Sequence, residues 1–440
     1  MKEQGGLSNR GNAALDTLKG FGFKPEDNVR RKEPRPSPGE PPIDQSVAEN
    51  WCIRPELIAL FQDAFKTALT SEHLSYSDSH LGDTRVMKGL SQFINQYFNP
   101  LYPVESSHIA LAPGSSNCLA GLLRQICDPG DGVLIPAPFW NGFDFHFTVN
   151  AQVHPVVAPV QDIRDSLNAD AMIASLTNAY NDTPLQTRAL ILTNPGNPIG
   201  QCYTKDLLER CVRFCQERNI HLICDEVYAL TCFGASTRSS ASFQSILSLN
   251  LDALGCDRSR VHVVWSLSKD FGCSGIRLGC VVSQSNPELI LALRLPTATE
   301  VSSLSTLCTT ALLTSSKLPE LIKLNTKRLN ESYRSIINVL TKHDRDYIPA
   351  TAGLFVFALL QPQAKTADDE AEFQQRLKEE GIIVSPGRAY HLGSETRGWY
   401  RLTFALEPGQ LNKAMGVSVN QYAIKYGSIS KMDAQHLRIG

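Results

Sequence analysis

The stretch "VVWSLSKDFGCSGIRLGC", from Val263 to Cys280, joins an apolar, strand-like run to a lysine. Its apolar run ends at Ser266, Ser268 and Lys269, and a turn rich in glycine then leads to Arg277. Such a run predicts a strand that is covered on both faces of a sheet. A single lysine at a strand end is usually a solvated charge, so its meaning depends on the rest of the chain.

Short apolar runs alternate with segments of helical period along the middle of the chain. The runs are "GVLIPAP", "RALILTNP", "HLICDEVY", "VHVVWSLS" and "LGCVVSQ". Between them, "TKDLLERCVRFCQERN" places Leu207, Leu208, Cys211 and Cys215 on one helical face after the expected N-cap Thr204. Strands that alternate with helices predict an α/β fold with a mostly parallel sheet.

The pattern changes after about Leu318, where a long polar helix, "PELIKLNTKRLNESYRSIINVLTKH", begins. The later strand segments "AGLFVFALL" and "GWYRLTFAL" flank the helix "DDEAEFQQRLKEEG", which predicts a smaller α+β domain. We expect a poorly ordered segment at 1–42, the N-terminal part of the small domain at 43–75, a large cofactor-binding domain at 76–318, the C-terminal small domain at 319–425 and a tail at 426–440.

Composition and charge favour a globular enzyme that acts on small molecules. The formal net charge of −2 offers no field to hold nucleic acid or an anionic membrane. The N-terminus lacks the apolar core of a signal peptide and no run is long enough to span a membrane, so we expect a cytoplasmic protein. The twelve cysteines show no paired metal-binding spacing, which predicts reduced core thiols and no metal site.

Polar residues follow the ends of the predicted strands, and ligands of open α/β sheets bind at these ends. They occur in "APGSSN", "PAPFW", "TNPGNPIG", "CDEVY" and "SLSK". Together they offer a Gly/Ser turn that opens a helix, an aromatic face, an amide, an acid with a phenol, and a lysine. This set fits pyridoxal phosphate, which carries an aldehyde, a phenolic oxygen, a pyridine ring and a phosphate.

The ordered motifs resemble those of fold-type I aminotransferases of class I/II. The nearest subgroup is similar to 1-aminocyclopropane-1-carboxylate synthases, where "TNPGNPIG", "DEVYA", "SLSKDFG", "AGLFVF", "SPG" and "GWYRLTFA" occur in this order. The resemblance spans about Ile43 to Ala405. It implies a large domain with a mostly parallel seven-stranded sheet, a smaller α+β domain, pyridoxal phosphate as cofactor, an amino acid substrate and a homodimer.

The resemblance assigns roles to the residues around the cofactor ring. Lys269 would bond to the cofactor's aldehyde and take the substrate's Cα proton. Asp225 would pair with the protonated ring nitrogen, a role that also explains an acid after a buried strand. Tyr228 and Asn197 would bond the phenolic oxygen, and Trp140 would stack on the ring, although a core role remains an alternative for the aromatic residues.

The resemblance also assigns residues that bind the cofactor's phosphate and the substrate's carboxylate. The phosphate is assigned to a helix N-terminus and nearby polar groups, namely Gly114, Ser115, Ser116, Ser266, Ser268 and Arg277. Arg401 would bind the substrate α-carboxylate through its planar pair of donors. The stretch "VAENW" resembles a site-lining segment of the subgroup, which makes Ala48, Glu49 and Asn50 candidates.

One departure from the subgroup bears on the reaction. Where the resemblance places a tyrosine that reaches the neighbouring subunit's cofactor and handles S-adenosylmethionine, this chain has Ser79, with Tyr76 nearby. Cyclopropane formation is therefore disfavoured. The elements "AENW", "APGSSN" and "PFWNGFD" are similar to fungal proteins of sulfur-bridged diketopiperazine biosynthesis, which implies carbon–sulfur bond cleavage in a cysteine adduct.

Two alternatives to carbon–sulfur cleavage remain open from the sequence. The first is an amino acid transaminase, which would use the same lysine, aspartate and arginine. The second is a non-catalytic binding or regulatory protein on the same fold. The presence of both Lys269 and Arg401, without a helix-turn-helix segment in the first 42 residues, argues against the second.

Overall fold

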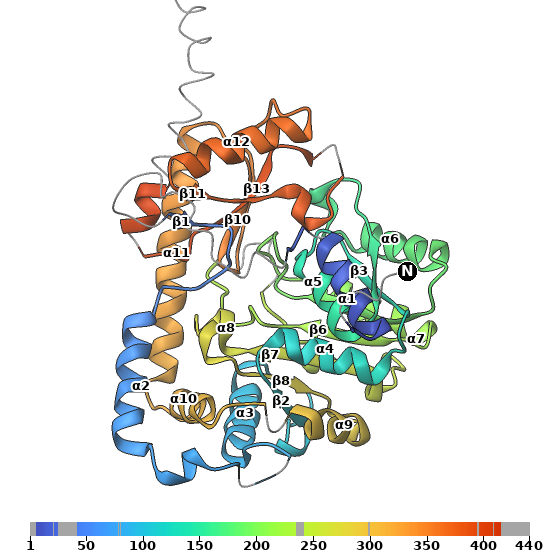
Figure 1. Ribbon diagram of the computed structural model, residues 1–440, viewed down its shortest axis with the longest axis vertical. Helices are drawn as coiled ribbons and strands as arrows, with labels where there is room; N and C mark the ends of the chain where they lie inside the picture. Colours follow the sequence, from blue (N-terminus) through green and yellow to red (C-terminus); the bar gives the residue numbers. More distant parts are fainter. Residues whose placement is uncertain are drawn as a thin grey trace, which may run out of the picture.

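The computed structural model describes residues 6–20, 22–24, 42–77, 79, 81–234, 242–297, 300–393, 396–407 and 409–414. Its centre is a seven-stranded sheet with the order β2-β8-β7-β6-β5-β3-β4 (Figure 1). The strands are β2 (Ile109–Ala112), β3 (Gly132–Pro136), β4 (His154–Ala158), β5 (Thr187–Thr193), β6 (His221–Asp225), β7 (Val261–Ser266) and β8 (Gly279–Val282). Only β8 runs antiparallel to its neighbours, so the predicted mostly parallel α/β sheet is confirmed.

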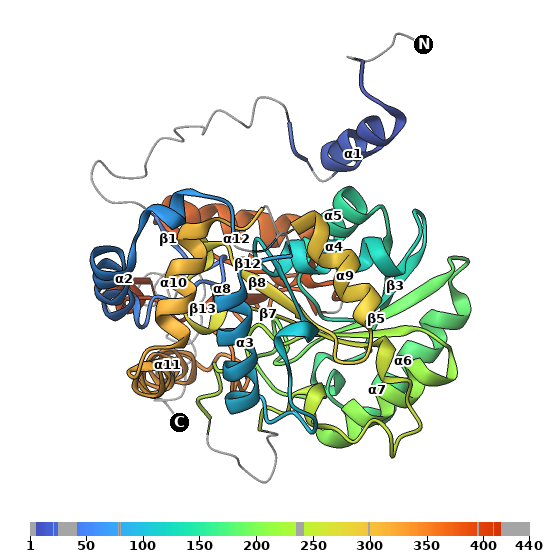
Figure 2. The same cartoon turned by 90° about the horizontal axis from the view of Figure 1, so that it is seen from below.

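Helices cover both faces of this sheet (Figure 2). They include α3 (Thr84–Tyr97), α4 (Ser115–Ile126), α5 (Gly142–His146), α6 (Ala169–Asp182), α7 (Lys205–Glu217), α9 (Pro287–Thr297) and α10 (Ser303–Leu313). Side chains alternate along the strands, so Leu190 and Leu192 pack with the α6 and α7 side while Ala189 and Ile191 pack with the α4 side. The predicted cap of α7 is present, because the Thr204 hydroxyl accepts a hydrogen bond from the backbone of Leu207.

A second, smaller sheet lies beside the large one and has the order β12-β13-β10-β9. Its strands are β9 (Tyr347–Ile348), β10 (Phe355–Leu359), β12 (Ser385–Pro386) and β13 (Trp399–Thr403), and all its pairings are antiparallel. Helix α12 (Ala367–Glu379) packs on it, and β1 (Ile43–Asp44) pairs with β11 (Ile382–Ile383). A segment near residue 43 therefore joins the C-terminal part of the fold.

Helix α11 (Leu318–Lys342) connects the two cores. Its first residues Leu318 and Leu321 pack in the core of the large sheet, whereas Leu329, Ile336 and Leu340 pack in the core of the small sheet. The helix α2 (Arg54–Ala68) lies alongside α10 at the same end of the molecule (Figure 1). The exact domain boundaries at residues 76 and 319 stay a prediction.

The N-terminal region contains a helix that the sequence did not lead us to expect. Residues 1–42 were predicted to lack order, yet Asn9–Gly20 form α1, which contacts the turn at Phe147–Ala151. The helix-forming stretch "NAALDTLKG" and an edge-on contact between Phe23 and Phe145 account for it. The predicted tail at 426–440 lies outside the described residues. None of the helices that the structure describes has the length and apolarity needed to cross a bilayer.

Candidate active site

A cavity of about 300 Å³ lies where the carboxyl ends of β5, β6 and β7 face the N-terminus of α4 and the strand β13. Its lining comprises Ser46, Val47, Ala48, Ser115, Ser116, Leu119, Trp140, Phe143, Thr193, Asn197, Asp225, Val227, Tyr228, Ser268, Lys269, Ser274, Arg277 and Arg401. Nearly all the side chains that the sequence predicted to act together therefore face one space. They come from segments up to 355 residues apart, such as Ser46 and Arg401.

Lys269 lies in the short helix α8 (Leu267–Asp270), directly after β7. Its amine donates a hydrogen bond to the Ala48 carbonyl oxygen at 2.7 Å. Burial, and then the nearby charge of Arg401, lower the pKa of the Lys269 amine from 10.5 to about 8. About a tenth of this amine is therefore neutral at pH 7, far more than for an ordinary lysine, and this form can act as a nucleophile or a base.

Asp225 is the last residue of β6 and is buried. Its Oδ1 has no hydrogen-bond partner among the described residues, and burial raises the pKa of its carboxyl to about 7, although the Val227 backbone and Lys269 oppose that rise. A buried acceptor without a donor is costly. A protonated ring nitrogen would supply both the missing donor and the missing positive charge, so this carboxyl fits the pyridine ring of pyridoxal phosphate.

The N-terminus of α4 and Arg277 form a cradle for an anion. Gly114 precedes the helix with a φ of +87°, and a Cβ there would lie 2.5 Å from Nη2 of Arg277. A Cβ on Gly279 would lie 2.9 Å from the Gly114 carbonyl carbon. Helix N-terminal amides and a guanidinium so close together match a phosphate group, and both glycines are needed for the approach.

The predicted phosphate residues do not all reach this cradle. Ser115, Ser116, Ser268 and Arg277 line the cavity. Ser266 is fully buried and does not line it; its hydroxyl accepts a hydrogen bond from the backbone of Ser268 and caps α8. Ser266 therefore shapes the turn that carries Lys269, as an N-cap does in any helix.

Arg401 lies on β13 and is buried. Nη1 donates to Oδ1 of Asn197 at 2.9 Å, and Nη2 donates to the Ser46 carbonyl oxygen. Its Nε has no partner, and none of the described carboxylates forms an ion pair with it. A buried guanidinium without a counter-charge fits a substrate carboxylate, because that ligand would provide the missing charge.

Two aromatic residues bound the cavity as predicted. Tyr228 is buried with its ring edge-on to Phe355, and burial raises the pKa of its hydroxyl. Trp140 is half-buried beside Phe143, and a Cβ on Gly142 would lie 2.2 Å from the indole. Both rings face the space that a cofactor ring would take, and their contacts to the cofactor stay a prediction.

The segment after β1 contributes differently from the prediction. Ala48 lines the cavity through its carbonyl contact with Lys269, but Glu49 pairs with Arg54 at 2.6 Å outside the lining. Asn50 also lies outside it, fully buried: its Nδ2 approaches the carbonyl oxygens of Lys269 and Asp270 at 3.2 and 3.3 Å. Its position behind the lysine suits a residue that holds the α8 backbone, not one that binds substrate.

Sequence reasoning missed Asn325, a buried amide on α11. It accepts a hydrogen bond from Asn50 at 2.9 Å and donates to the Asp270 carbonyl oxygen at 3.0 Å. An asparagine inside an otherwise apolar helical face is the only signal in the sequence. Thr193, which ends β5 and lines the cavity, could have been found from its place at a strand end.

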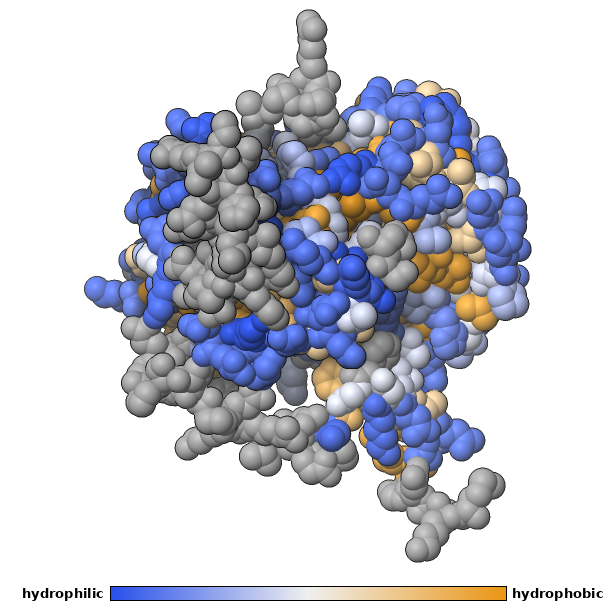
Figure 3. Space-filling view, turned by 90° about the horizontal axis from the view of Figure 1, so that it is seen from above, coloured by the Kyte–Doolittle hydropathy of each residue, from blue (hydrophilic) through white to orange (hydrophobic). Residues whose placement is uncertain are grey.

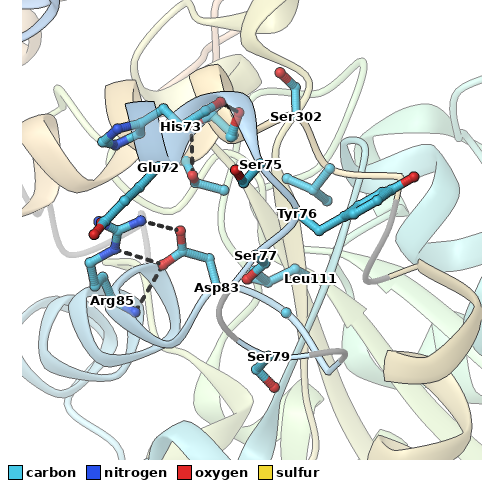
Figure 4. A pocket seen from close by; sticks show the side chains of 14 residues that line it. Glu72, His73, Ser75, Tyr76, Ser77, Ser79, Asp83, Arg85, Leu111 and Ser302 are labelled. Carbon is cyan, nitrogen blue, oxygen red and sulfur yellow. Dashed lines mark hydrogen bonds and ion pairs between the residues drawn. The ribbon is translucent and has the colours of Figure 1, made fainter. Parts of the chain in front are cut away.

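A second cavity, of about 670 Å³, holds the residues that departed from the subgroup pattern (Figure 4). Tyr76 and Ser79 line it together with Glu72, His73 and Ser302. Neither Tyr76 nor Ser79 lines the cavity of Lys269. Within this chain, therefore, Tyr76 does not take the place of a side chain beside the cofactor.

Comparisons with known proteins agree with this geometry. Residues 57–417 match the family model for aminotransferase class I and II. The probable aminotransferase aclI of Aspergillus oryzae is 46% identical over 411 residues, which cover 93% of this chain and 96% of that protein. The trimodular acetylaranotin synthesis protein ataIMG of Aspergillus terreus is 47% identical over 392 residues, or 89% of this chain and 39% of that protein.

Solved structures show the same fold at low sequence identity. Aspartate aminotransferase from Thermus thermophilus with maleate aligns with a TM-score of 0.73 at 19% identity, over 94% of this chain and 99% of that one. The predicted fold-type I architecture is therefore confirmed.

Proposed function

The chain belongs to the family of class I and II aminotransferases and is a pyridoxal phosphate enzyme, and on that premise we propose that it cleaves the carbon–sulfur bond of a cysteine S-conjugate. In the proposed net reaction, the conjugate and water give a thiol, pyruvate and ammonium. The Cα–H, Cβ–S and Cα–N bonds break: the sulfur leaves as a thiol with a proton, the nitrogen leaves as ammonium, and water supplies the keto oxygen at Cα. Cβ gains the hydrogen that completes the methyl group of pyruvate. No second substrate is consumed other than water.

When bound, pyridoxal phosphate supplies an aldehyde that condenses with amines and a ring that accepts the electron pair left by the Cα proton. The described residues provide for each part of it. Lys269 would hold the aldehyde carbon, Asp225 the ring nitrogen, Tyr228 and Asn197 the phenolic oxygen, and the cradle at Gly114 and Arg277 the phosphate.

Arg401 would bind the substrate α-carboxylate and orient the Cα–H bond toward Lys269. Its donors now contact Asn197 and the Ser46 carbonyl, both neutral acceptors that a carboxylate can displace or join. Lys269, released from the cofactor, would take the Cα proton, since the lowered pKa of its amine leaves it neutral often enough to serve as a base. The same ammonium could then protonate the departing sulfur.

The charged residues of the cavity lining indicate which substrate side chain the enzyme prefers. Its described basic residues are Lys269, Arg277 and Arg401, and each already has a task toward the aldehyde, the phosphate or the α-carboxylate. No described basic side chain remains for a second carboxylate. Val47, Leu119 and Phe143 supply apolar surface instead, which favours a neutral thioether over an acidic side chain.

The relatives support secondary metabolism as the setting, since ataIMG is named for acetylaranotin synthesis. The choice of elimination rests on the similarity of "APGSSN" and "PFWNGFD" to fungal proteins that act on cysteine adducts. Transamination is the second candidate, because aclI is named a probable aminotransferase. Cyclopropane formation ranks third, since this chain has Ser79 where the subgroup has the tyrosine that handles S-adenosylmethionine.

Acceptor dependence distinguishes the first two candidates. Cofactor-loaded protein would receive an S-alkyl cysteine conjugate without any α-keto acid, and thiol and pyruvate would be followed together. Sustained release of both in equal amounts supports elimination. A single half-turnover that ends in the pyridoxamine form, and resumes on addition of an α-keto acid, would instead establish transamination.

We further propose that the enzyme works as a homodimer through the end of the molecule that carries α2, α9 and α10. Exposed apolar side chains concentrate there, with Tyr76 90%, Leu74 83% and Leu295 69% exposed. Figure 3 views the opposite end, where hydrophilic residues cover most of the coloured surface. An apolar area of this kind is typical of a protein interface, and a second copy of the chain would cover it.

Light scattering of the purified protein tests the dimer. A mass of two chains is expected, and Leu74→Asp with Leu295→Asp should shift it toward one chain. The exposed Gln375→Asp on α12, at the opposite end of the molecule (Figure 1), is the control for added negative charge and should leave the mass unchanged. A wild-type mass of one chain at micromolar concentration would reject the dimer.

A further inference from the structure

Two cysteines far apart in sequence lie in direct contact beside the active site. Sγ of Cys202 lies 3.7 Å from Sγ of Cys232. Cys202 is buried and Cys232 is partly exposed. Neither thiol lines the cavity of Lys269, and the proposed reaction uses neither. The contact therefore needs an explanation other than catalysis.

Both cysteines follow segments that carry active-site residues. Cys202 comes five residues after Asn197, and Cys232 comes four residues after Tyr228. The Thr231 hydroxyl next to Cys232 bonds the Tyr228 carbonyl at 2.6 Å. A covalent link between the two sulfurs would thus tie together the two loops that hold the expected partners of the cofactor's phenolic oxygen.

The same two loops carry the connection to β10 of the small sheet. The Gly200 carbonyl accepts hydrogen bonds from the backbones of Thr351 and Ala352 at 2.8 and 2.9 Å. The Thr351 carbonyl accepts from the backbones of Phe233 and Gly234, both at 3.0 Å. The segment before β10 is therefore hydrogen-bonded to both loops that carry a cysteine. The bonded residues of these loops lie at most two positions along the chain from Cys202 or Cys232.

We propose that Cys202 and Cys232 are a redox-active pair that forms a reversible disulfide by exchange with a low-molecular-weight disulfide. A disulfide bond is about 2.05 Å long, so side-chain rotation must bring sulfurs already in contact closer together. The pair stands apart from Cys211 and Cys215, which are both fully buried on α7 and offer no exposed thiol to a reagent.

The exchange runs in two steps that balance atoms and electrons. The Cys232 thiolate, on the partly exposed side, attacks one sulfur of the reagent disulfide, forms a mixed disulfide and releases one thiol. Cys202 then displaces the second thiol from Cys232, and the protein disulfide forms. The two cysteines lose two protons and two electrons in all, and the reagent gains them as two thiols.

The order of the steps follows from the surroundings of each sulfur. The hydrogen bond with Cys232 and then burial raise the pKa of the Cys202 thiol far above its ordinary value. A buried, protonated thiol does not start the exchange with an external reagent. Cys202 is thus the resolving cysteine: it attacks the mixed disulfide on Cys232 and does not react with the reagent itself.

Oxidised glutathione added to the reduced, cofactor-loaded enzyme tests the pair, with peptide mass spectrometry under non-reducing conditions as the readout. Wild type is expected to yield a Cys202–Cys232 cross-linked peptide that retains no glutathione and is released by dithiothreitol. Cys202→Ser should instead trap one glutathione on Cys232. Cys232→Ser should leave Cys202 as a free thiol.

Cys256→Ser is the matched control, because Cys256 is also partly exposed and belongs to a different part of the fold. It should form the cross-link as wild type does. Cys202→Ala replaces Cys202→Ser if the serine variant fails to fold. Glutathione retained on Cys232 of the wild type, or modification of Cys256 while both members of the pair stay reduced, would overturn the proposal. The readout does not depend on which reaction the enzyme catalyses.

Discussion

Arg401 and Asn197 are joined by a 2.9 Å hydrogen bond between Nη1 and Oδ1, which connects the small sheet to the loop after β5 of the large sheet. The two residues were predicted to serve different ligands, the substrate carboxylate and the cofactor. If these roles hold, their contact would put the two ligands in neighbouring parts of one cavity. It also orients the guanidinium before substrate arrives, which lowers the entropy lost on binding.

Arg401→Ala is expected to raise KM roughly 10- to 100-fold with a smaller change in kcat, because it removes a charge-assisted hydrogen-bonded pair worth about 1.5 to 3 kcal/mol. Arg401→Lys should recover only part of the loss, since an ammonium cannot reproduce the planar fork. Steady-state kinetics with the cysteine conjugate measures both. Arg164→Ala, an exposed arginine, is the control for the change in net charge. An unchanged KM in Arg401→Ala would place the carboxylate site elsewhere.

The rate at which pyridoxal phosphate bonds to the apoprotein should increase with pH through a midpoint near pH 8 and level off about one pH unit higher. Burial lowers the pKa of the Lys269 amine to about 8, so the protonated, non-nucleophilic form dominates below that value and is lost above it. Stopped-flow absorbance follows the covalent step. A midpoint near the ordinary lysine value would contradict the predicted environment.

Lys269→Ala should abolish both the absorbance change and turnover. Full activity in that variant would remove the assignment of Lys269 as the residue that bonds to the cofactor.

Gly114→Ala is expected to weaken cofactor binding about tenfold or more. The new methyl would lie 2.5 Å from Nη2 of Arg277, and a φ of +87° is disfavoured for alanine. Titration of the apoprotein with pyridoxal phosphate measures the effect. Gly255→Ala is a control for alanine at a positive φ, since its φ is +65° and its Cβ would meet no atom within 4 Å. Equal losses in both variants would show that strain, not the cradle, is responsible.

The central sheet and the site residues at its strand ends could be predicted because their signals are local. Each buried strand is a continuous apolar run, and Asp225 and Lys269 stand at or just after the ends of such runs. Parallel strands bring those ends to one edge of the sheet, so the site follows from the fold. The ordered motifs then supplied the chemistry. The roles of the individual residues followed from the resemblance of these motifs to those of a known family.

Contacts between distant segments could not be predicted in this way. The pairing of β1 with β11, and the contact of Cys202 with Cys232, depend on how packed elements meet in space. The placement of Asn50 was mistaken for the same reason, because its neighbours on α8 and α11 lie more than 200 residues away. One sequence carries no record of such proximity. Helix α1 was missed because charged and proline-rich residues around it dominate the local composition.

We infer from its contacts that Asn325 positions Lys269, and its removal should lower kcat more than it changes KM. Its amide donates to the Asp270 carbonyl at 3.0 Å and accepts from Asn50 at 2.9 Å, so it fixes the backbone of the helix that carries the lysine. Asn325→Ala removes one partner from the Asp270 carbonyl and one from the Asn50 amide, which keep their contact with each other at 3.3 Å, so each lost hydrogen bond should cost about 0.5 to 1.5 kcal/mol in the free energy of unfolding.

Stability loss alone would not distinguish a positioning role from an ordinary core role. We therefore expect Asn325→Ala also to slow the exchange of the substrate Cα proton with deuterated water, measured by NMR on folded, cofactor-saturated enzyme. Thr326→Ala is the control on the same helix, because its hydroxyl bonds only the Ile322 carbonyl at 3.0 Å within α11. A variant at 325 that unfolds more easily but exchanges the Cα proton at the wild-type rate would confine Asn325 to the packing of α11 against α8.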